Sequence, residues 1–257
     1  MSIRTFAFWR DRLRASGIHL GISLVIAALA AVLVFLIWYP YPYREISGGR
    51  ELFMILVSVD VILGPLITLS IFNRAKPWPV LRRDLAVIGL VQLAALSYGL
   101  WTVFEVRPVH LVFEYNRFRA VHAIDVAHEL KDKAPKDLRT MPLTGPTPLG
   151  LRPLKDGNEK LEVTMAAMSG LELGFRPDLW QSYDKSRAEV LKEGKTAEQL
   201  KQRFPDKVRE IDAAISRTGR QAAQLLYLPM VGRQTFWTVW VDSRSADVLG
   251  FMPLDSF

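Results

Sequence analysis

Residues 17–39 read GIHLGISLVIAALAAVLVFLIWY, an apolar run long enough to cross a lipid bilayer. Two comparable runs follow, LFMILVSVDVILGPLITLSIF at residues 52–72 and LAVIGLVQLAALSYGLWTVF at residues 85–104. An α-helix rises about 1.5 Å per residue, so roughly 20 apolar residues span a hydrocarbon core of about 30 Å. The three runs therefore predict an α-helical membrane domain of three transmembrane helices at residues 17–104, followed by an extracytoplasmic domain at residues 105–257.

The first run follows a short basic segment, so a cleaved signal peptide is the alternative to a retained helix. The apolar region of a signal peptide has roughly 7–15 residues, and this run is longer. The sequence after it, YPYPYREISGG, is a poor cleavage site. Pro40 and Pro42 end the helix among aromatic residues that are typical of a membrane interface. We therefore expect the first run to remain as a transmembrane helix.

Positive charges predict the orientation of the helices. Basic residues gather before the first helix and between the second and third: Arg4, Arg10, Arg12, Arg14, Arg74, Lys76, Arg82 and Arg83. Loops rich in Lys and Arg stay in the cytoplasm, so we expect residues 1–16 and the second loop there. The charges of the first loop cancel. Three crossings then place the C-terminal domain in the periplasm, if the membrane is a bacterial inner membrane.

Composition excludes several classes of function. Ten basic and five acidic residues precede residue 105, against 23 and 21 from residue 105 onward, so much of the net charge of +7 belongs to the flanks of the helices. No basic patch with interleaved aromatic residues stands out, and no nucleic-acid partner is predicted. Cysteine is absent, which excludes disulfides, thiolate nucleophiles and zinc–cysteine sites.

The C-terminal half is predicted to be a small α+β domain. We expect strands at residues 109–123 (a hairpin around Tyr115–Arg117), 161–175 (interrupted at Ser169–Gly170), 224–228, 236–241 and 248–252. The strand FWTVWV at 236–241 is apolar on both faces, which indicates burial on both sides. Five prolines between residues 135 and 153 predict a loop.

Helices are predicted between these strands. Residues 125–133 favour one or two helical turns, and Pro177–Asp178 favours the start of a helix that ends near Glu193. Thr196 and Gln199 have the spacing of a capping box, which predicts the start of a further helix. Pro205–Asp206 should interrupt that helix and restart it.

Asp60 is the one charged residue inside the three apolar runs. A carboxylate near the centre of a transmembrane helix costs about 3 kcal/mol on insertion scales, so it should face protein or water. Two interpretations stay open. Asp60 contacts a polar group on the helix of a partner protein, or it forms an internal hydrogen bond to Ser58, Gln92 or Ser97.

Gly64 and Pro65 lie one turn beyond Asp60. The proline ring removes one backbone hydrogen bond and should kink the helix. The carbonyl groups that it leaves without a donor could bind a partner, although a purely structural role is the alternative. Asp60, Gly64, Pro65 and Gln92 are therefore the candidate partner-binding residues.

Sequence motifs for catalysis and metal binding are lacking. His110 and His122 are equidistant from Asn116, so a symmetric hairpin would place them opposite each other. A metal site needs a third or fourth ligand, for which His128 and Asp125 are possible but not implied. No G-x-S-x-G, Walker A or H-E-x-x-H motif is present. We therefore predict no catalytic, cofactor or metal site, and no enzyme.

Several segments resemble one protein family. They are SGGRELF at 47–53, VDVILGPLITLSIFNRAKP at 59–77, LRRDLAVIGLVQLAALSYGLWTVFEVRPVHLVFEYNRFRAV at 81–121 and VLGFMPLD at 248–255. The sequence is similar in these segments to the type IV pilin accessory proteins of the TfpX/TfpZ group. The resemblance covers residues 10–125 and about the last 35 residues.

The resemblance implies a function at the bacterial inner membrane. Members of the group assist the assembly or surface display of one major type IV pilin. A pilin is itself a single-pass membrane protein with a periplasmic head before it joins the fibre, so a partner with membrane and periplasmic domains can contact both parts. Two alternatives remain, an accessory subunit of a pilin-modifying enzyme and a membrane-anchored periplasmic sensor. Which pilin is recognised, and the oligomeric state, stay open.

Overall fold

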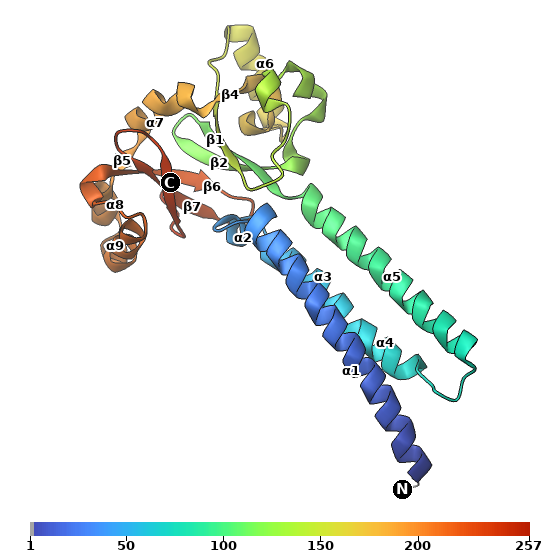
Figure 1. Cartoon of the computed structure of the whole chain (residues 1–257). Coiled ribbons are helices and arrows are strands. Elements are labelled where there is room, and N and C mark those ends of the chain that lie inside the picture. The colour runs from blue at the N-terminus through green and yellow to red at the C-terminus, as the bar shows by residue number, and fades with distance from the viewer. Residues whose placement is uncertain (1–2) are drawn as a thin grey trace. The chain divides into compact units, whose positions relative to one another are not determined.

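The computed structural model describes residues 3–257, with side chains from residue 8 onward; residues 1–2 and the side chain of Arg4 lie outside the described part. The chain forms two compact units, which Figure 1 shows. The first, here the membrane unit, contains Met1–Tyr41 and Gly49–Glu105. The second, here the soluble unit, contains Pro42–Gly48 and Val106–Phe257.

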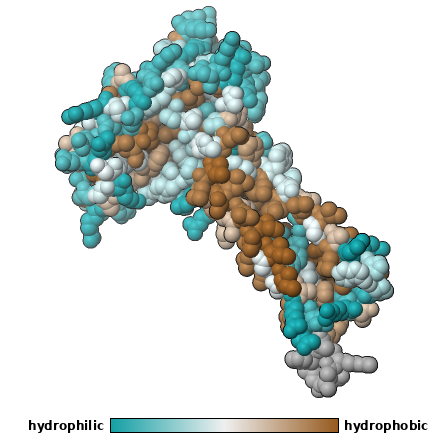
Figure 2. Space-filling model, in the orientation of Figure 1, coloured by the Kyte–Doolittle hydropathy of each residue, from teal (hydrophilic) through white to brown (hydrophobic). Residues whose placement is uncertain are grey.

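Three helices of the membrane unit are long and apolar enough to cross a membrane: Phe8–Trp38, Gly49–Ile71 and Trp78–Glu105. The first consists of α1 (Ile3–Val32) and a π-helical turn (Leu33–Trp38). The second consists of α3 (Gly49–Ser58), a π-helical turn (Val59–Leu63) and α4 (Gly64–Ile71). The third is α5 (Trp78–Glu105). Figure 2 shows the apolar side chains that these helices expose.

The helices of the membrane unit contact one another through a small apolar core and a few polar bonds. Val34, Tyr39, Phe53 and Val103 are buried together, and the Tyr39 hydroxyl donates to the Val103 carbonyl over 3.0 Å. Most other apolar side chains face outward, which is expected for helices surrounded by lipid.

The soluble unit is built on a mixed sheet of eight strands. They are β1 (Pro108–Glu114), β2 (Arg117–His122), β3 (Thr147–Leu151), β4 (Trp180–Ser182), β5 (Lys195–Thr196), β6 (Leu225–Val231), β7 (Phe236–Asp242) and β8 (Val248–Met252). Their order is β4-β3-β1-β2-β6-β7-β8, and β5 pairs with β6. The β1–β3 and β2–β6 pairs are parallel and the others antiparallel. The prediction of three long apolar helices followed by a mixed α/β domain is confirmed.

Helices cover the sheet at several places. They are α6 (Gly157–Met168), α7 (Arg187–Glu193), α8 (Ala197–Arg203) and α9 (Val208–Arg217). The capping box between Thr196 and Gln199 is present at the start of α8, as predicted. Pro205 begins the short turn that separates α8 from α9, also as predicted. Leu200 and Ile211 from these two helices pack against Trp240 of β7 in a shared core.

A short helix from the first loop of the membrane unit belongs to the core of the soluble unit. This helix, α2 (Tyr43–Ile46), packs Tyr43 and the fully buried Ile46 among Phe113, Phe118 and other core side chains. The backbone amides of Arg233 and Gln234, in the β6–β7 turn, donate to the Ile46 carbonyl over 3.1 and 3.3 Å. The soluble unit therefore has a core residue that lies far outside residues 105–257.

Residues 161–175 do not form the predicted strand. Most of the segment is helix α6, in which the Asp156 side chain accepts from the Glu159 amide at the N-terminus. At the other end Gly170 has φ +93°, and the amide of Leu171 donates to the Ala166 carbonyl. These are the N-cap and the Schellman end of a helix. The prediction of a strand was wrong, because Asp156 and Gly170 cap a helix at its two ends.

The region of five prolines contains a strand, and the predicted helix from Pro177 begins later. Strand β3 lies inside the predicted loop, and Pro148 precedes the residues of β3 that pair with β4. A missing amide donor is tolerated at such a position. Between Pro177 and the start of α7 at Arg187, the chain forms strand β4, which extends the sheet. A continuous helix was predicted there.

The hairpin of β1 and β2 has a different register from the predicted one. Its loop has two residues, because Glu114 pairs with Arg117, and the residue with positive φ is Tyr115 at 59°, not Asn116. His110 consequently lies opposite Val121, and a bulge places His122 opposite Pro108. The predicted pairing of the two histidines is therefore wrong.

Candidate functional site

Asp60 forms an internal hydrogen bond across two helices of the membrane unit. The side-chain amide of Gln92 on α5 donates to Asp60 Oδ1 over 3.0 Å. Ser58 instead donates to the Met54 carbonyl of its own helix. Of the internal partners considered for Asp60, the structure thus selects Gln92. Within the described residues no donor contacts the second carboxylate oxygen, Oδ2, so its hydrogen-bonding capacity remains.

Pro65 explains why Gln92 is also near the backbone at this point. The turn before it, Val59–Leu63, is π-helical, so hydrogen bonds there join residues five apart. Proline has no amide hydrogen, and the carbonyl five residues before Pro65 is that of Asp60. The Gln92 side-chain amide lies 3.5 Å from this carbonyl oxygen. One glutamine side chain therefore faces both the carboxylate and the carbonyl of Asp60.

Gly64 makes room for polar groups from both neighbouring helices. A Cβ atom at this position would lie 3.1 Å from His19 Nε2 of α1 and would clash with Gln92 Nε2 of α5. The other ring nitrogen of His19 is 2.6 Å from the Thr68 hydroxyl of α4. The absence of a side chain at Gly64 thus allows a layer of polar groups that reaches across all three helices.

A groove of about 430 Å³ runs between α3–α4 and α5. Its walls are mostly apolar and extend from Leu52 to Ile67 on one side and from Val91 to Val103 on the other. Asp60 lies near the middle of the first wall and Gln92 near the start of the second, and Gly64 also lines the groove. A ligand in this groove would meet an apolar surface that contains one hydrogen-bonding pair.

Three of the four predicted residues meet in this groove, and the fourth does not. Asp60, Gly64 and Gln92 line it, whereas Pro65 is buried and its carbonyl accepts from the Ser16 hydroxyl of α1 over 2.9 Å. Sequence reasoning missed His19 as a member of the polar layer. The signal was a lone histidine inside the first apolar run, which is rare at membrane depth.

The histidines of the soluble unit occupy separate sites. His110 Nδ1 lies 2.8 Å from the Thr147 hydroxyl, and His122 Nδ1 lies 3.0 Å from Asp125 Oδ2. Burial lowers the pKa of His110 to about 4, so this ring is neutral at pH 7. In the described part of the chain, no group of three or more metal-binding side chains comes together.

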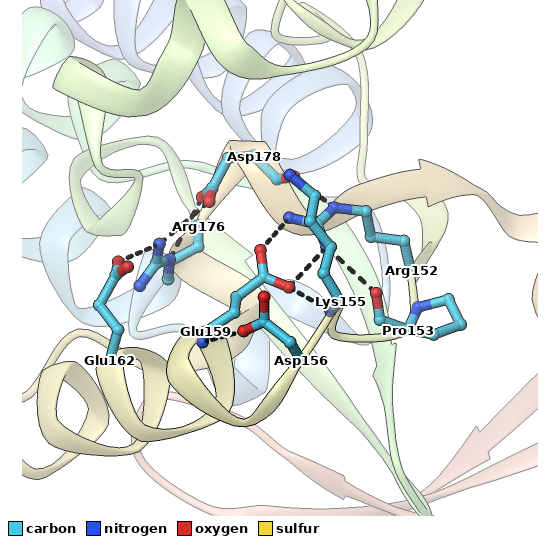
Figure 3. Close-up of polar contacts among 8 residues, drawn as sticks. All are labelled: Arg152, Pro153, Lys155, Asp156, Glu159, Glu162, Arg176 and Asp178. Carbon is cyan, nitrogen blue, oxygen red and sulfur yellow. Dashed lines mark hydrogen bonds and ion pairs between the residues drawn. The ribbon is translucent and has the colours of Figure 1, made fainter.

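A dense polar cluster of the soluble unit has a structural explanation (Figure 3). Arg152 makes two bonds of 2.7 and 3.1 Å to the carboxylate of Glu159 at the start of α6. Arg176 contacts Glu162 and Asp178 at 2.9 and 3.0 Å. The hydrogen bond from Arg152 is the main cause that lowers the pKa of Glu159 to about 2. Each guanidinium points at a carboxylate, so the cluster attaches α6 to the loops beside β3 and β4.

The chain is similar over nearly its whole length to two proteins of Dichelobacter nodosus. The fimbrial assembly protein of serogroup I is 30% identical over 249 residues, which cover 95% of both chains. The fimbrial assembly protein of serogroup E1 shows the same identity and coverage. The chain belongs to the family of fimbrial assembly proteins. The sequence-family model of the fimbrial assembly protein FimB matches residues 7–48. No solved structure matches the chain.

Membership of the fimbrial assembly family agrees with the resemblance seen in the sequence at the level of fimbria assembly. The relative from serogroups C1 and C2 is 38% identical over 123 residues, which cover 92% of that protein and 48% of this chain. The segment that matches the FimB model contains the first long helix and α2. Both the membrane unit and the core of the soluble unit therefore contain residues of the matched segment.

Proposed function

We propose that this fimbrial assembly protein is a non-enzymatic accessory protein of the TfpX/TfpZ type, which assists the assembly of one type IV pilin. It does so at the bacterial inner membrane, by contacting the pilin within the bilayer and in the periplasm. The groove of the membrane unit is the observation that carries this proposal. An apolar groove open to lipid, with a hydrogen-bonding pair in its wall, fits a transmembrane helix that presents a polar side chain at the depth of that pair.

Asp60 is the group that distinguishes such a helix from lipid. Gln92 already occupies Oδ1, and Oδ2 is available for a further hydrogen bond. A lipid acyl chain offers neither a donor nor an acceptor. A helix with a polar side chain at this level gains a hydrogen bond of roughly 0.5–2 kcal/mol in a membrane environment. This hydrogen bond would therefore favour the pilin helix over lipid in the groove.

The test is co-purification of the pilin from solubilised membranes with variants at Asp60. Asp60→Asn keeps the shape and most of the hydrogen bonding, and should retain the pilin. Asp60→Leu removes both and should lose most of it. Ser70→Leu is the matched control, since Ser70 is exposed on α4 and donates only to the Leu66 carbonyl of its own helix. Equal retention by Asp60→Leu and Ser70→Leu, at wild-type abundance, would contradict the assignment.

The proposal also includes an orientation, with the N-terminus in the cytoplasm and the soluble unit in the periplasm. Alkaline phosphatase is active only in the periplasm. A fusion after Phe257 should therefore be active, and a fusion after Lys76, between the second and third spans, should be inactive. The reverse pattern would place the soluble unit in the cytoplasm and remove the periplasmic contact from the proposal.

A further inference from the structure

The β6–β7 turn is tied to the point at which the chain enters the membrane. Besides the two amide bonds from Arg233 and Gln234 to the Ile46 carbonyl, the Gln234 side chain packs on Gly48. A Cβ atom at Gly48 would lie 2.9 Å from Gln234 Nε2, and Gly48 has φ +72°. The turn thus contacts both Ile46 and Gly48 within the soluble unit.

The covalent chain sets how far this turn can lie from the bilayer. Gly48 immediately precedes Gly49, where the second membrane span begins. A residue extends the chain by at most about 3.5 Å, so Ile46 lies within roughly 10 Å of the start of that span. The β6–β7 turn is therefore bonded to a residue that is only three positions from the start of the second span.

Two large aromatic side chains are exposed beside this turn. Phe236, the first residue of β7, is 50% exposed, and Phe257 at the C-terminus is 43% exposed. Their rings form an edge-to-face pair with centroids 5.3 Å apart. The Thr238 hydroxyl bonds to the Leu254 carbonyl over 2.7 Å and to Ser256 Oγ over 2.9 Å, which attaches the C-terminal segment to β7. The pair is thus part of the fold and does not depend on a loose tail.

A positive side chain accompanies the aromatic pair. Arg233 is exposed in the β6–β7 turn and, among the residues that the structure describes, forms no ion pair within 4 Å. Its charge acts on Asp125 only at longer range. Aromatic rings accumulate at membrane interfaces, and guanidinium groups bind phosphate through charge-assisted hydrogen bonds. An aromatic pair with a neighbouring arginine is the combination that suits a phospholipid headgroup region.

We propose that Arg233, Phe236 and Phe257 form a membrane-facing patch, which rests on the phospholipid interface of the leaflet on the same side as the soluble unit. The occupant of the patch is lipid, because the turn beside the patch is bonded to a residue only three positions from the start of the second span. This contact limits the orientations of the soluble unit on the bilayer. It concerns lipid alone and does not depend on the pilin.

The absence of cysteine in the native chain allows a direct test. Single variants Phe236→Cys and Phe257→Cys of the full chain are labelled with an environment-sensitive fluorophore and reconstituted into vesicles of phosphatidylcholine and phosphatidylglycerol. Lipids that carry a nitroxide on the headgroup serve as quenchers. Met168→Cys is the control, because Met168 on α6 is also apolar and is 79% exposed, but has no link to the membrane entry.

Labels at positions 236 and 257 should be quenched several-fold more strongly than the label at position 168, in the absence of pilin. Because Phe257 lies outside the strands of the sheet, its variant keeps the test valid even if Phe236→Cys disturbs β7. Quenching at 236 and 257 no greater than at 168 would overturn the proposal. The proposal would also be overturned if the labels were shielded from a soluble quencher and yet unaffected by the nitroxide lipids, because the patch would then face protein.

Discussion

At the scale of single residues, the packing of the membrane unit requires a glycine at position 64. Gly64 lies where His19 from α1 and Gln92 from α5 both approach α4. Any Cβ atom there meets a polar nitrogen whose hydrogen bonds join two helices. Hydrogen bonds between helices contribute to the stability of a membrane domain, since lipid supplies no hydrophobic force that holds helices together.

The expected effect of Gly64→Ala follows from this crowding. The new methyl group should displace Gln92 from Asp60 and lower the stability of the membrane unit by about 1–3 kcal/mol, as overpacking commonly does. Gly89→Ala is the control, since a Cβ at Gly89 on α5 meets nothing within 4 Å. Thermal unfolding in detergent, followed by far-UV circular dichroism, measures both. Equal melting temperatures for the two variants would contradict the close approach at Gly64.

His110 predicts a dependence of stability on pH. Burial lowers its pKa in the folded chain to about 4, from 6.5 when exposed. Between these values the unfolded chain binds a proton that the folded chain does not. Stability is therefore complete above pH 6.5 and is lost as the pH falls toward 4, by at most about 3 kcal/mol for this group.

Thermal unfolding at pH 7 and pH 4.5 tests the contribution of His110. The melting temperature of the native chain should fall further between these pH values than that of His110→Gln. His128→Gln, at an exposed histidine, should behave like the native chain. A native and a His110→Gln chain with the same pH dependence would show that the buried ring does not contribute.

At the scale of secondary-structure elements, α6 illustrates how helix ends compensate for little apolar burial. Its N-terminus has the Asp156 cap, which accepts from the Glu159 amide over 2.8 Å, and its C-terminus has Gly170 at positive φ. Only Val163 is buried among the residues of the helix. With so little apolar burial, the caps and the Arg152–Glu159 pair supply much of what holds α6 in place.

Asp156→Ala should therefore lower the stability of the soluble unit by about 1 kcal/mol, the usual cost of a lost N-cap. In a unit of this size that corresponds to a fall of roughly 2–4 °C in melting temperature. Gly157→Ala serves as the control, because a Cβ there meets nothing within 4 Å and alanine favours the helix. Near-UV circular dichroism reports the transition. A loss of stability in the control equal to that in Asp156→Ala would rule out the cap as the cause.

At the scale of the whole molecule, the soluble unit is discontinuous in sequence. Helix α2, from the loop between the first two spans, contributes Tyr43 and Ile46 to a core formed mainly by β1, β2, β6 and β7. Burial of a large apolar side chain stabilises a fold by about 1.5–3 kcal/mol. The segment Pro42–Gly48 is thus a part of the soluble fold as much as a connection between helices.

A substitution in this loop should destabilise the soluble unit. Ile46→Ala should cost about 2–5 kcal/mol, because Ile46 is fully buried and its removal leaves a cavity. Ile124→Ala is the matched control within residues 106–257, since Ile124 is 54% exposed and should lose less than about 1 kcal/mol. Unfolding of the full chain in detergent, monitored by near-UV circular dichroism, compares the two. A smaller effect at Ile46 than at Ile124 would show that α2 is dispensable.

Much of the site was visible in the sequence, because membrane helices give strong local signals. Asp60, Gly64 and Gln92 stood out since a charge, a glycine beside proline and an amide are unusual in apolar runs. His19 did not, because its significance depends on Thr68 and Gly64, which lie on another helix. Pro65 was assigned to the same site, yet its position on the face toward α1 could only come from the packing of the helices.

The three long apolar helices, the capping box at Thr196 and the buried strand β7 can be predicted from local sequence, because each follows from the spacing of residues along a short stretch of chain. The register of the β1–β2 hairpin and the place of α2 depend instead on contacts between distant parts of the chain. A hairpin register changes with a single residue in the loop. Ile46 is a core residue because it packs among side chains of β1, β2, β6 and β7, and because two amides almost 190 positions away donate to its carbonyl. No local sequence pattern encodes contacts over such a separation.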